Sequence, residues 1–293
     1  MSDRRLPAEI LDHVVDHLHD TQGALRNCCL VSKSWVSRTR KHLFADIKFY
    51  PKSLQSWKET FPDPSTSPAR YAKKLHIVHP QVVTAADAEL GGWIRGFSRV
   101  VHFKVGSSIY DLSKLSFAPF HGFSPVIKSL SVVISAFPAS WIFNLILSFP
   151  LLEDLSLFVH DNRPGDGFGV DEMPIIQPSS PRVLTGSLDL RVLGRGIGPF
   201  TCRLLSLPGG IHFRKLSWTW SREEELSPIM GLVEACSHTL ETLNVTCNLA
   251  GRPIWCLHPR RITYSCFQSD RSQLRSTSRN HQNSNMWCSG AEG

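Results

Sequence analysis

The sequence predicts an α/β (α+β) fold, in which a small all-α module is followed by an irregular solenoid of strands and helices. Hydrophobic residues make up 42% and charged residues 19% of the 293 residues, a composition that can bury a core. Apolar residues recur at helical spacing near the amino terminus. Further along, a triplet of apolar, variable and apolar residues recurs at a near-constant interval. We therefore expect a helical module at 1–50, a linker at 51–70, a repeat domain at 71–264 and a disordered tail at 265–293.

The amino-terminal module is predicted to contain two or three short helices. Pro7 opens the first, because proline loses no hydrogen bond in the first helical turn. Its apolar stripe consists of Ile10, Leu11, Val14, Val15 and Leu18. A second helix is expected from about Ala24, with residues spaced for burial at Leu25, Cys28, Cys29, Val31, Trp35 and Val36. Helices this short bury little on their own, so the module is expected to lean on a partner or on the next domain.

The ordered combination of residues 5–49 resembles an F-box. The family pattern of Leu-Pro, an apolar helix, C-x-L-V-S-x-x-W and a closing Leu-Phe is met by Leu6, Pro7, Ile10, Leu11, Val14, Leu18, Leu25, Cys28, Leu30, Val31, Ser32, Trp35, Leu43 and Phe44. This resemblance implies that the module binds the Skp adaptor of a cullin-RING ubiquitin ligase. The implied adaptor-binding residues are Leu6, Pro7, Ile10, Leu11, Val14, Leu30, Val31 and Trp35. The alternative is a helical cap on the next domain that binds no adaptor.

The segment from Pro51 to Arg70 contains the run FPDPSTSPAR, in which proline and serine are frequent. Such a cluster is expected not to hold a helix. We therefore interpret it as a linker.

The repeat domain is predicted from triplets that begin 25 to 33 residues apart, at Leu75, Val101, Leu130, Leu155, Leu188, Leu216 and Leu243. A further triplet is Ile262-Thr263-Tyr264. The intervals carry residues at helical spacing, namely Leu90, Trp93, Ile94 and Phe97, then Ile142, Leu145, Ile146 and Phe149, then Ile229, Leu232, Val233 and Cys236. A strand followed by an amphipathic helix, repeated in this way, buries a continuous core.

These repeats resemble the degenerate leucine-rich repeats that follow F-boxes in large fungal families, although the asparagine position of regular repeats is missing. The resemblance implies a protein substrate bound on the outward face of the strands. The variable residues of the triplets would line that face: His76, His102, Ser131, Ser156, Asp189, Ser217 and Asn244.

A charge-free run from Ser129 to Leu152 has about the length that spans a bilayer. Pro138 lies inside it, and a strand near Leu130 followed by a helix ending before Pro150 explains the same residues without a membrane. The polar residues Met1 to Arg5 do not resemble a signal peptide, so we expect an intracellular protein, cytoplasmic or nuclear or both.

Three patterns imitate sites of chemistry. Gly194, Gly196 and Gly198 imitate a nucleotide loop, but Pro199 stands where the third glycine belongs. The run 161–172 imitates a calcium loop, yet Met173 takes the place of the bidentate glutamate. The Cys-x-His pairs at Cys236 and Cys256 are too closely spaced for structural zinc. We therefore expect no cofactor, no metal and no enzyme active site, and we interpret Cys28 as a small buried hydrophobe and not a redox thiol.

The formal net charge of +7 is spread along the chain, without a basic run interleaved with aromatic residues, so nucleic acid is not the expected partner. The segment 265–293 loses periodicity, and we hypothesise that it is non-native and that terminal repeats are missing. The leading interpretation is a non-catalytic substrate receptor of a ubiquitin ligase. The alternatives are a repeat scaffold without ligase coupling and, more remotely, an enzyme that uses Gly194–Gly198.

Overall fold

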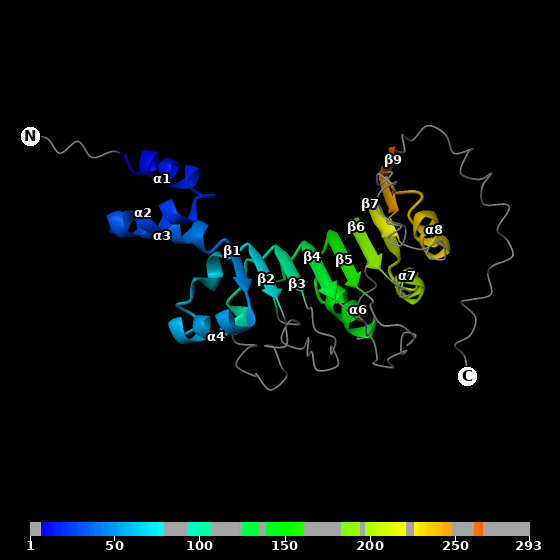
Figure 1. Ribbon diagram of the computed structural model, residues 1–293, viewed down its shortest axis with the longest axis horizontal. Helices are drawn as coiled ribbons and strands as arrows, with labels where there is room; N and C mark the ends of the chain where they lie inside the picture. Colours follow the sequence, from blue (N-terminus) through cyan, green and yellow to red (C-terminus); the bar gives the residue numbers. More distant parts are fainter. Residues whose placement is uncertain are drawn as a thin grey trace, which may run out of the picture. The chain divides into compact units, whose positions relative to one another are not determined.

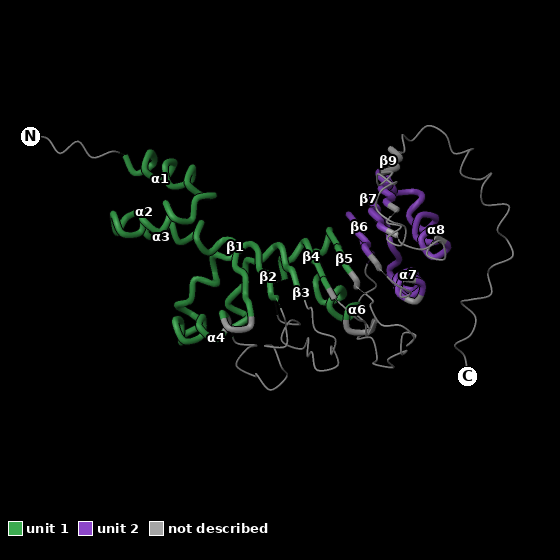
Figure 2. Tube along the Cα trace, viewed as in Figure 1, with its two compact units in different colours: residues 1–158, 170–176 green, residues 159–169, 177–293 purple. Residues whose placement is uncertain are grey.

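The computed structural model describes residues 7–78, 93–106, 123, 125–134, 139–160, 183–193, 197–220, 226–247 and 261–265. The chain forms two compact units (Figure 2). Unit 1 comprises Met1–Phe158 and Val170–Ile176, and unit 2 comprises Val159–Gly169 and Gln177–Gly293. Both units combine helices with mainly parallel strands, which confirms the α/β class (Figure 1). The predicted repeat domain at 71–264 is thus divided between the two units.

Three helices form the amino-terminal module: α1 (Ala8–His17), α2 (Gln22–Val31) and α3 (Lys33–Leu43). The expected second helix is divided at Ser32, whose backbone is extended with φ −152° and ψ 138°. The Ser32 hydroxyl accepts a hydrogen bond from the Ser34 N–H at 3.3 Å and caps α3. The extended backbone of Ser32 therefore ends α2 and its side chain caps α3, which the apolar spacing alone does not reveal.

The segment interpreted as a linker contains an α-helix in its first half, before the run FPDPSTSPAR that was expected not to hold one. Helix α4 spans Pro51–Thr60, and a short 3₁₀ helix, η1, spans Pro68–Tyr71. Pro51 lies in the first turn of α4, where its missing N–H interrupts no helical hydrogen bond. The Ser53 hydroxyl further fixes this terminus by accepting a hydrogen bond from the Tyr50 N–H at 2.6 Å.

The strands of unit 1 follow one another in chain order as β1 (Asp46–Phe49), β2 (Lys74–Val78), β3 (His102–Gly106), β4 (Ser129–Ile134) and β5 (Asp154–His160). β1 to β4 pair in parallel, and β1 was expected to belong to the helical module. Alternate residues face the core and are at most 6% exposed: Ile47, Phe49, Leu75, Ile77, Phe103, Val105, Leu130 and Val132. The remaining residues of each strand face outward.

The register corrects one predicted triplet. Leu75 is paired with Phe103, so the third strand presents Phe103-Lys104-Val105 and not Val101-His102-Phe103. The first inward residues of β1 to β4 are therefore spaced by 75−47 = 28, 103−75 = 28 and 130−103 = 27 residues. The repetition is therefore more regular in the structure than the apolar pattern indicated. Val101, Phe103 and Val105 all alternate with polar residues, so the sequence alone does not show which two of them face the core.

One pattern of backbone hydrogen bonds recurs at the strand starts of unit 1. The carbonyl oxygen of the residue directly before one strand accepts hydrogen bonds from two successive N–H groups at the start of the next strand. The acceptor Ala45 binds residues 73 and 74, Lys73 binds 101 and 102, Val101 binds 128 and 129, and Lys128 binds 153 and 154, all at 2.7–3.0 Å. This carbonyl ladder aligns the starts of β1 to β5 and so fixes the register.

The charge-free run forms strand β4 and helix α6 (Ala139–Leu147), as the alternative to a membrane span predicted. Pro138 lies outside the described residues. No helix in the described part of the chain is both long enough and apolar enough to cross a membrane. The predicted core residues of the intervals are buried at Trp93, Ile94, Phe97, Ile142, Leu145, Ile146, Phe149, Ile229, Leu232 and Cys236. Val233 is only half-buried, and Leu90 lies outside the described residues.

Unit 2 contains β6 (Leu184–Leu193), α7 (Ile197–Leu205), β7 (Ile211–Trp220), α8 (Leu226–Ala235), β8 (Thr242–Cys247) and β9 (Arg261–Ser265). β6, β7 and β8 pair in parallel, with a bulge that leaves Arg214 as the extra residue opposite Gly186-Ser187. Gly186 adopts φ 89°, a conformation that disfavours other residues. β9 contains the predicted Ile262 triplet but pairs antiparallel with β8. The predicted tail beyond residue 265 lies outside the described residues.

Candidate functional site

The helical module exposes large apolar side chains. Ile10 and Val14 of α1 are 47% and 45% exposed, and Leu30 and Val31 at the end of α2 are 86% and 70% exposed. Ile10 and Val14 are four residues apart and therefore share one face of α1. We call these four residues the apolar helix surface. Single exposed apolar residues are common, but four in so short a module make a candidate binding surface.

The core of the module is small by comparison. Val15, Leu25 and Cys28 are its buried apolar residues, which confirms the interpretation of Cys28 as a packing residue. The expected burial of Val31 is wrong, because α2 ends at Val31 and leaves its side chain outside the helix packing. Pro7 is exposed, Leu11 and Trp35 are half-buried, and Leu6 lies outside the described residues.

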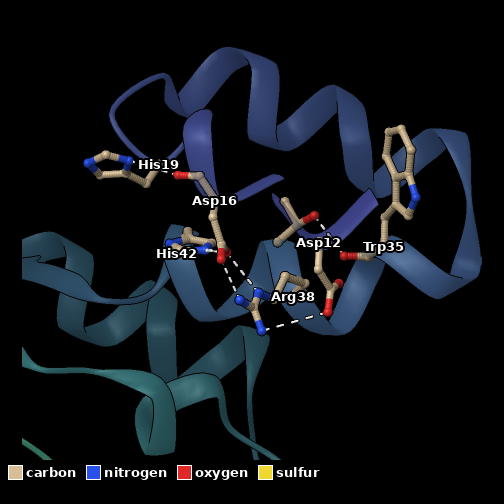
Figure 3. Close-up of polar contacts among 7 residues, drawn as sticks. Asp12, Asp16, His19, Trp35, Arg38 and His42 are labelled. Atoms are coloured by element: carbon tan, nitrogen blue, oxygen red, sulfur yellow. Dashed lines mark hydrogen bonds and ion pairs between the residues drawn. The ribbon is translucent and has the colours of Figure 1, made fainter. Parts of the chain in front are cut away.

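A polar cluster joins α1 to α3 (Figure 3). The Asp16 carboxylate accepts hydrogen bonds from the Arg38 guanidinium, with Nε at 2.8 Å from Oδ1 and Nη2 on Oδ2. His42 Nε2 donates to Oδ1 of the same carboxylate at 2.7 Å. Arg38 also forms a 3.8 Å ion pair with Asp12. Bidentate pairing of this kind fixes both the distance and the orientation of two helices.

The same cluster sets the ionisation of Asp16. The hydrogen bonds from Arg38 and then from His42 hold the pKa of the Asp16 carboxyl well below its usual range. Asp16 is therefore ionised at neutral pH and acts only as an acceptor, so His42 Nε2 carries the hydrogen of their bond. The F-box-like residue spacing gave no sign of this cluster.

An aromatic cluster packs the end of the module against the first strand. The Trp57 ring of α4 lies 5.9 Å from Phe44, which follows α3, and 5.4 Å from Phe49 of β1, measured between ring centroids. Phe61 and Phe97 lie 4.8 Å and 6.2 Å from the same indole. Because one side chain contacts both Phe44 at the end of α3 and Phe49 of β1, the cluster ties the end of the module to the first strand.

The outward face of β1 to β3 is basic. Paired residues form two rows across these strands, Asp46-Lys74-His102 and Lys48-His76-Lys104. The three lysines and His102 are exposed, and His76 is half-buried. The sequence prediction named His76 and His102 but missed the lysines, although Lys48 alternates with two buried residues in the short run Ile47-Lys48-Phe49. The register also shows that Lys104, and not His102, lies beside His76.

The remaining predicted substrate-face residues lie on the outward sides of their strands. Ser131 continues the row of Lys104, and Ser156 is half-buried on β5. In unit 2, Asp189, Ser217 and Asn244 are paired across β6, β7 and β8 and form one row. Asp189 accepts from Arg191 Nη2 at 2.9 Å, so this acidic group is already paired within its own strand.

The described residues of the patterns that imitate chemical sites do not come together as a site. Cys236 is buried, its thiol donates weakly to the Ile211 carbonyl at 3.9 Å, and burial raises its pKa. A thiol kept protonated in this way suits packing and not metal binding. Within the described ranges no group of three or more metal-ligating side chains comes together. Residues 161–173, 194–196 and 256–258 lie outside those ranges, whereas Gly198 and Pro199 of the glycine pattern lie in the first turn of α7.

Comparison with known proteins finds no matching family model, no matching curated protein and no matching solved structure.

Proposed function

We propose that this chain is the substrate-receptor subunit of a Skp–cullin–F-box ubiquitin ligase. The helical module binds the Skp adaptor, and the outward face of the strands binds a protein substrate. The chain catalyses nothing itself and raises the effective concentration of the substrate near the transfer machinery. Such a complex assembles in the cytoplasm, the nucleus or both.

The observation that carries the proposal is the exposure of the apolar helix surface. Ile10, Val14, Leu30 and Val31 are all members of the F-box-like pattern, and each is at least 45% exposed. A helical surface with anchors of this kind buries its apolar side chains in a partner. The proposal includes both assignments: the module is an F-box, and the strands belong to degenerate leucine-rich repeats.

The Trp57 cluster supports the coupling of the two tasks within unit 1. It ties the module to β1 through Phe44 and Phe49, so a substrate on the strands of unit 1 would be held at a defined place relative to the adaptor. A flexible tether would give a lower effective concentration at the transfer site.

Co-purification of the full chain with a Skp adaptor tests the proposal. Wild type is expected to retain the adaptor, and Leu30→Ser/Val31→Ser to lose at least tenfold in affinity, because apolar anchors dominate such interfaces. The matched control is Leu151→Ser, which removes a side chain that is 50% exposed outside the module. The control is expected to bind as wild type does. Absence of binding by wild type, or equal binding by both variants, would favour a repeat scaffold without ligase coupling.

A further inference from the structure

The outward face of β1 to β3 carries more positive side chains than nearby acidic side chains can neutralise. We call Lys48, Lys74, His76, His102 and Lys104 the basic strand face. Parallel strands lie about 4.8 Å apart, so the backbone positions of Lys48 and Lys104, on either side of His76, are about 10 Å apart. The structure thus spreads several cations over the exposed side of three strands instead of gathering them at one point.

Few acidic groups offset these charges. Asp46 is the single acid in the two rows, and in the described part of the chain none of the three lysines forms an ion pair. Lys128, just before β4, differs in that its ammonium pairs with Glu153 at 2.9 Å. Burial, followed by the positive charges of Lys104 and Lys48, lowers the pKa of His76, and Asp46 opposes this effect. The centre of the basic strand face therefore lies in a net positive field.

We propose that the basic strand face binds an extended segment of another protein that is rich in aspartate and glutamate. This rests on the proposed function and deepens it, because it names the class of substrate. In an extended segment, side chains on one side recur about every 6.7 Å, so successive carboxylates come within reach of lysines spread over about 10 Å. Electrostatic complementarity of this kind guides association and selects among partners.

The cations on this face favour several carboxylates over a single phosphate group. Arginine, which binds phosphate in a bidentate manner, does not occur among the described outward residues of β1 to β4. Lysines act as separate point charges, and they suit a ligand whose negative charges are also separate.

Fluorescence anisotropy with the full chain and a labelled peptide of alternating aspartate and serine tests the proposal. Lys48→Glu/Lys104→Glu is expected to weaken binding about tenfold, since each reversal turns an attraction into a repulsion. The matched control, Lys41→Glu/Lys215→Glu, makes the same change in net charge at exposed lysines of α3 and β7 and is expected to weaken binding less than twofold. Binding should also weaken as salt is raised from about 0.05 to 0.2 M.

Two further variants keep the test decisive if the reversed chain folds poorly. Lys48→Arg/Lys104→Arg retains the charge and should bind as wild type does, and Lys48→Gln/Lys104→Gln should lose about threefold. In addition, bound carboxylates should raise the pKa of His76, which an NMR titration of the imidazole measures with and without the peptide.

Equal losses in the reversal pair and its control would overturn the proposal, as would a His76 pKa that the peptide leaves unchanged. Tighter binding of oligothymidylate, with the same dependence on Lys48 and Lys104, would assign the surface to nucleic acid instead. None of these measurements uses the adaptor. Failure here with adaptor binding intact would therefore remove the substrate class alone, and the converse result would remove the ligase coupling alone.

Discussion

The helical module and the strands of unit 1 treat their apolar residues in opposite ways. In β1 to β4 the inward residues are at most 6% exposed, whereas the module leaves Leu30 86% and Val31 70% exposed. The strands are therefore stabilised mainly by hydrophobic burial. The module instead combines a small core with the Asp16–Arg38–His42 cluster and leaves large apolar side chains exposed. In the proposed function, stability and binding thus belong to different parts of one unit.

The largest effect on stability is expected in the strands. Phe103→Ala removes a ring that is 1% exposed and packs 4.9 Å from Phe123 between centroids. We expect a loss of about 3–5 kcal/mol in the free energy of unfolding, measured by urea denaturation. Lys104→Ala, its exposed neighbour, is the control and should change the free energy by less than about 0.5 kcal/mol. A small loss for Phe103→Ala would contradict the view that burial dominates here.

The Trp57 cluster joins the two regions, and its removal should have the next largest effect. Trp57→Ala is expected to cost about 3 kcal/mol, because four aromatic neighbours lose their central partner. Trp57→Phe should cost about 1 kcal/mol, since the buried indole Nε1 has no hydrogen-bond partner among the described residues. Urea denaturation distinguishes the two variants. Similar losses for both would show that the indole makes a polar contact of its own.

The polar cluster of the module predicts a dependence on pH. The pKa of Asp16 is lower in the folded chain than in the unfolded chain, so its stabilising contribution is complete above the ordinary carboxyl pKa of about 4. It is lost as the pH falls through that range towards the lower folded value. Asp16→Asn should therefore lower the midpoint of thermal unfolding at pH 7, by less than Trp57→Ala does.

The difference between wild type and Asp16→Asn should shrink as the pH approaches 3, because the wild-type carboxyl is then becoming protonated in the unfolded chain. Circular dichroism of the helical signal between pH 3 and 7 measures this difference. A gap that is independent of pH would mean that the substitution acts through packing and not through charge.

The smallest effect is expected on the apolar helix surface. Leu30→Ser should change the free energy of unfolding by less than about 0.5 kcal/mol, because the side chain is already in water. Leu25→Ala, on the same helix but with a fully buried side chain, should cost about 2–5 kcal/mol. Denaturation of the two variants side by side would test whether α2 separates a stabilising face from a binding face. A large loss for Leu30→Ser would place that residue in the core.

Apolar periodicity predicted the strands after β1 and most of their buried residues, because alternation and helical spacing follow directly from which side meets the core. Apolar periodicity did not predict helix boundaries that depend on a polar side chain or on the place of a proline in the helix. Ser32 ends one helix and caps the next, and Pro51 begins a helix because of where it stands. The choice of Phe103 over Val101 depends on the pairing with Leu75, which is a long-range contact that no local pattern contains.

The candidate surfaces were predicted less well than the fold. Of the eight residues that the family resemblance selected, five are exposed and two, Leu11 and Trp35, are half-buried, while Leu6 lies outside the described residues. The basic strand face was missed because its lysines are far apart in the sequence and become neighbours only through the parallel register. The Asp16 cluster was missed for the same reason, since its partners Arg38 and His42 lie on a different helix.

The carbonyl ladder has a consequence for how this chain can change in length. Ala45, Lys73 and Val101 each accept two N–H groups, so an insertion at a strand start would displace two hydrogen bonds and turn the strand's apolar side chains outward. Extra residues beyond the carboxyl end of a strand change neither these hydrogen bonds nor the direction of its apolar side chains. Relatives of this protein should therefore gain and lose residues after the strands, while the spacing from each accepting carbonyl to the first inward residue stays constant.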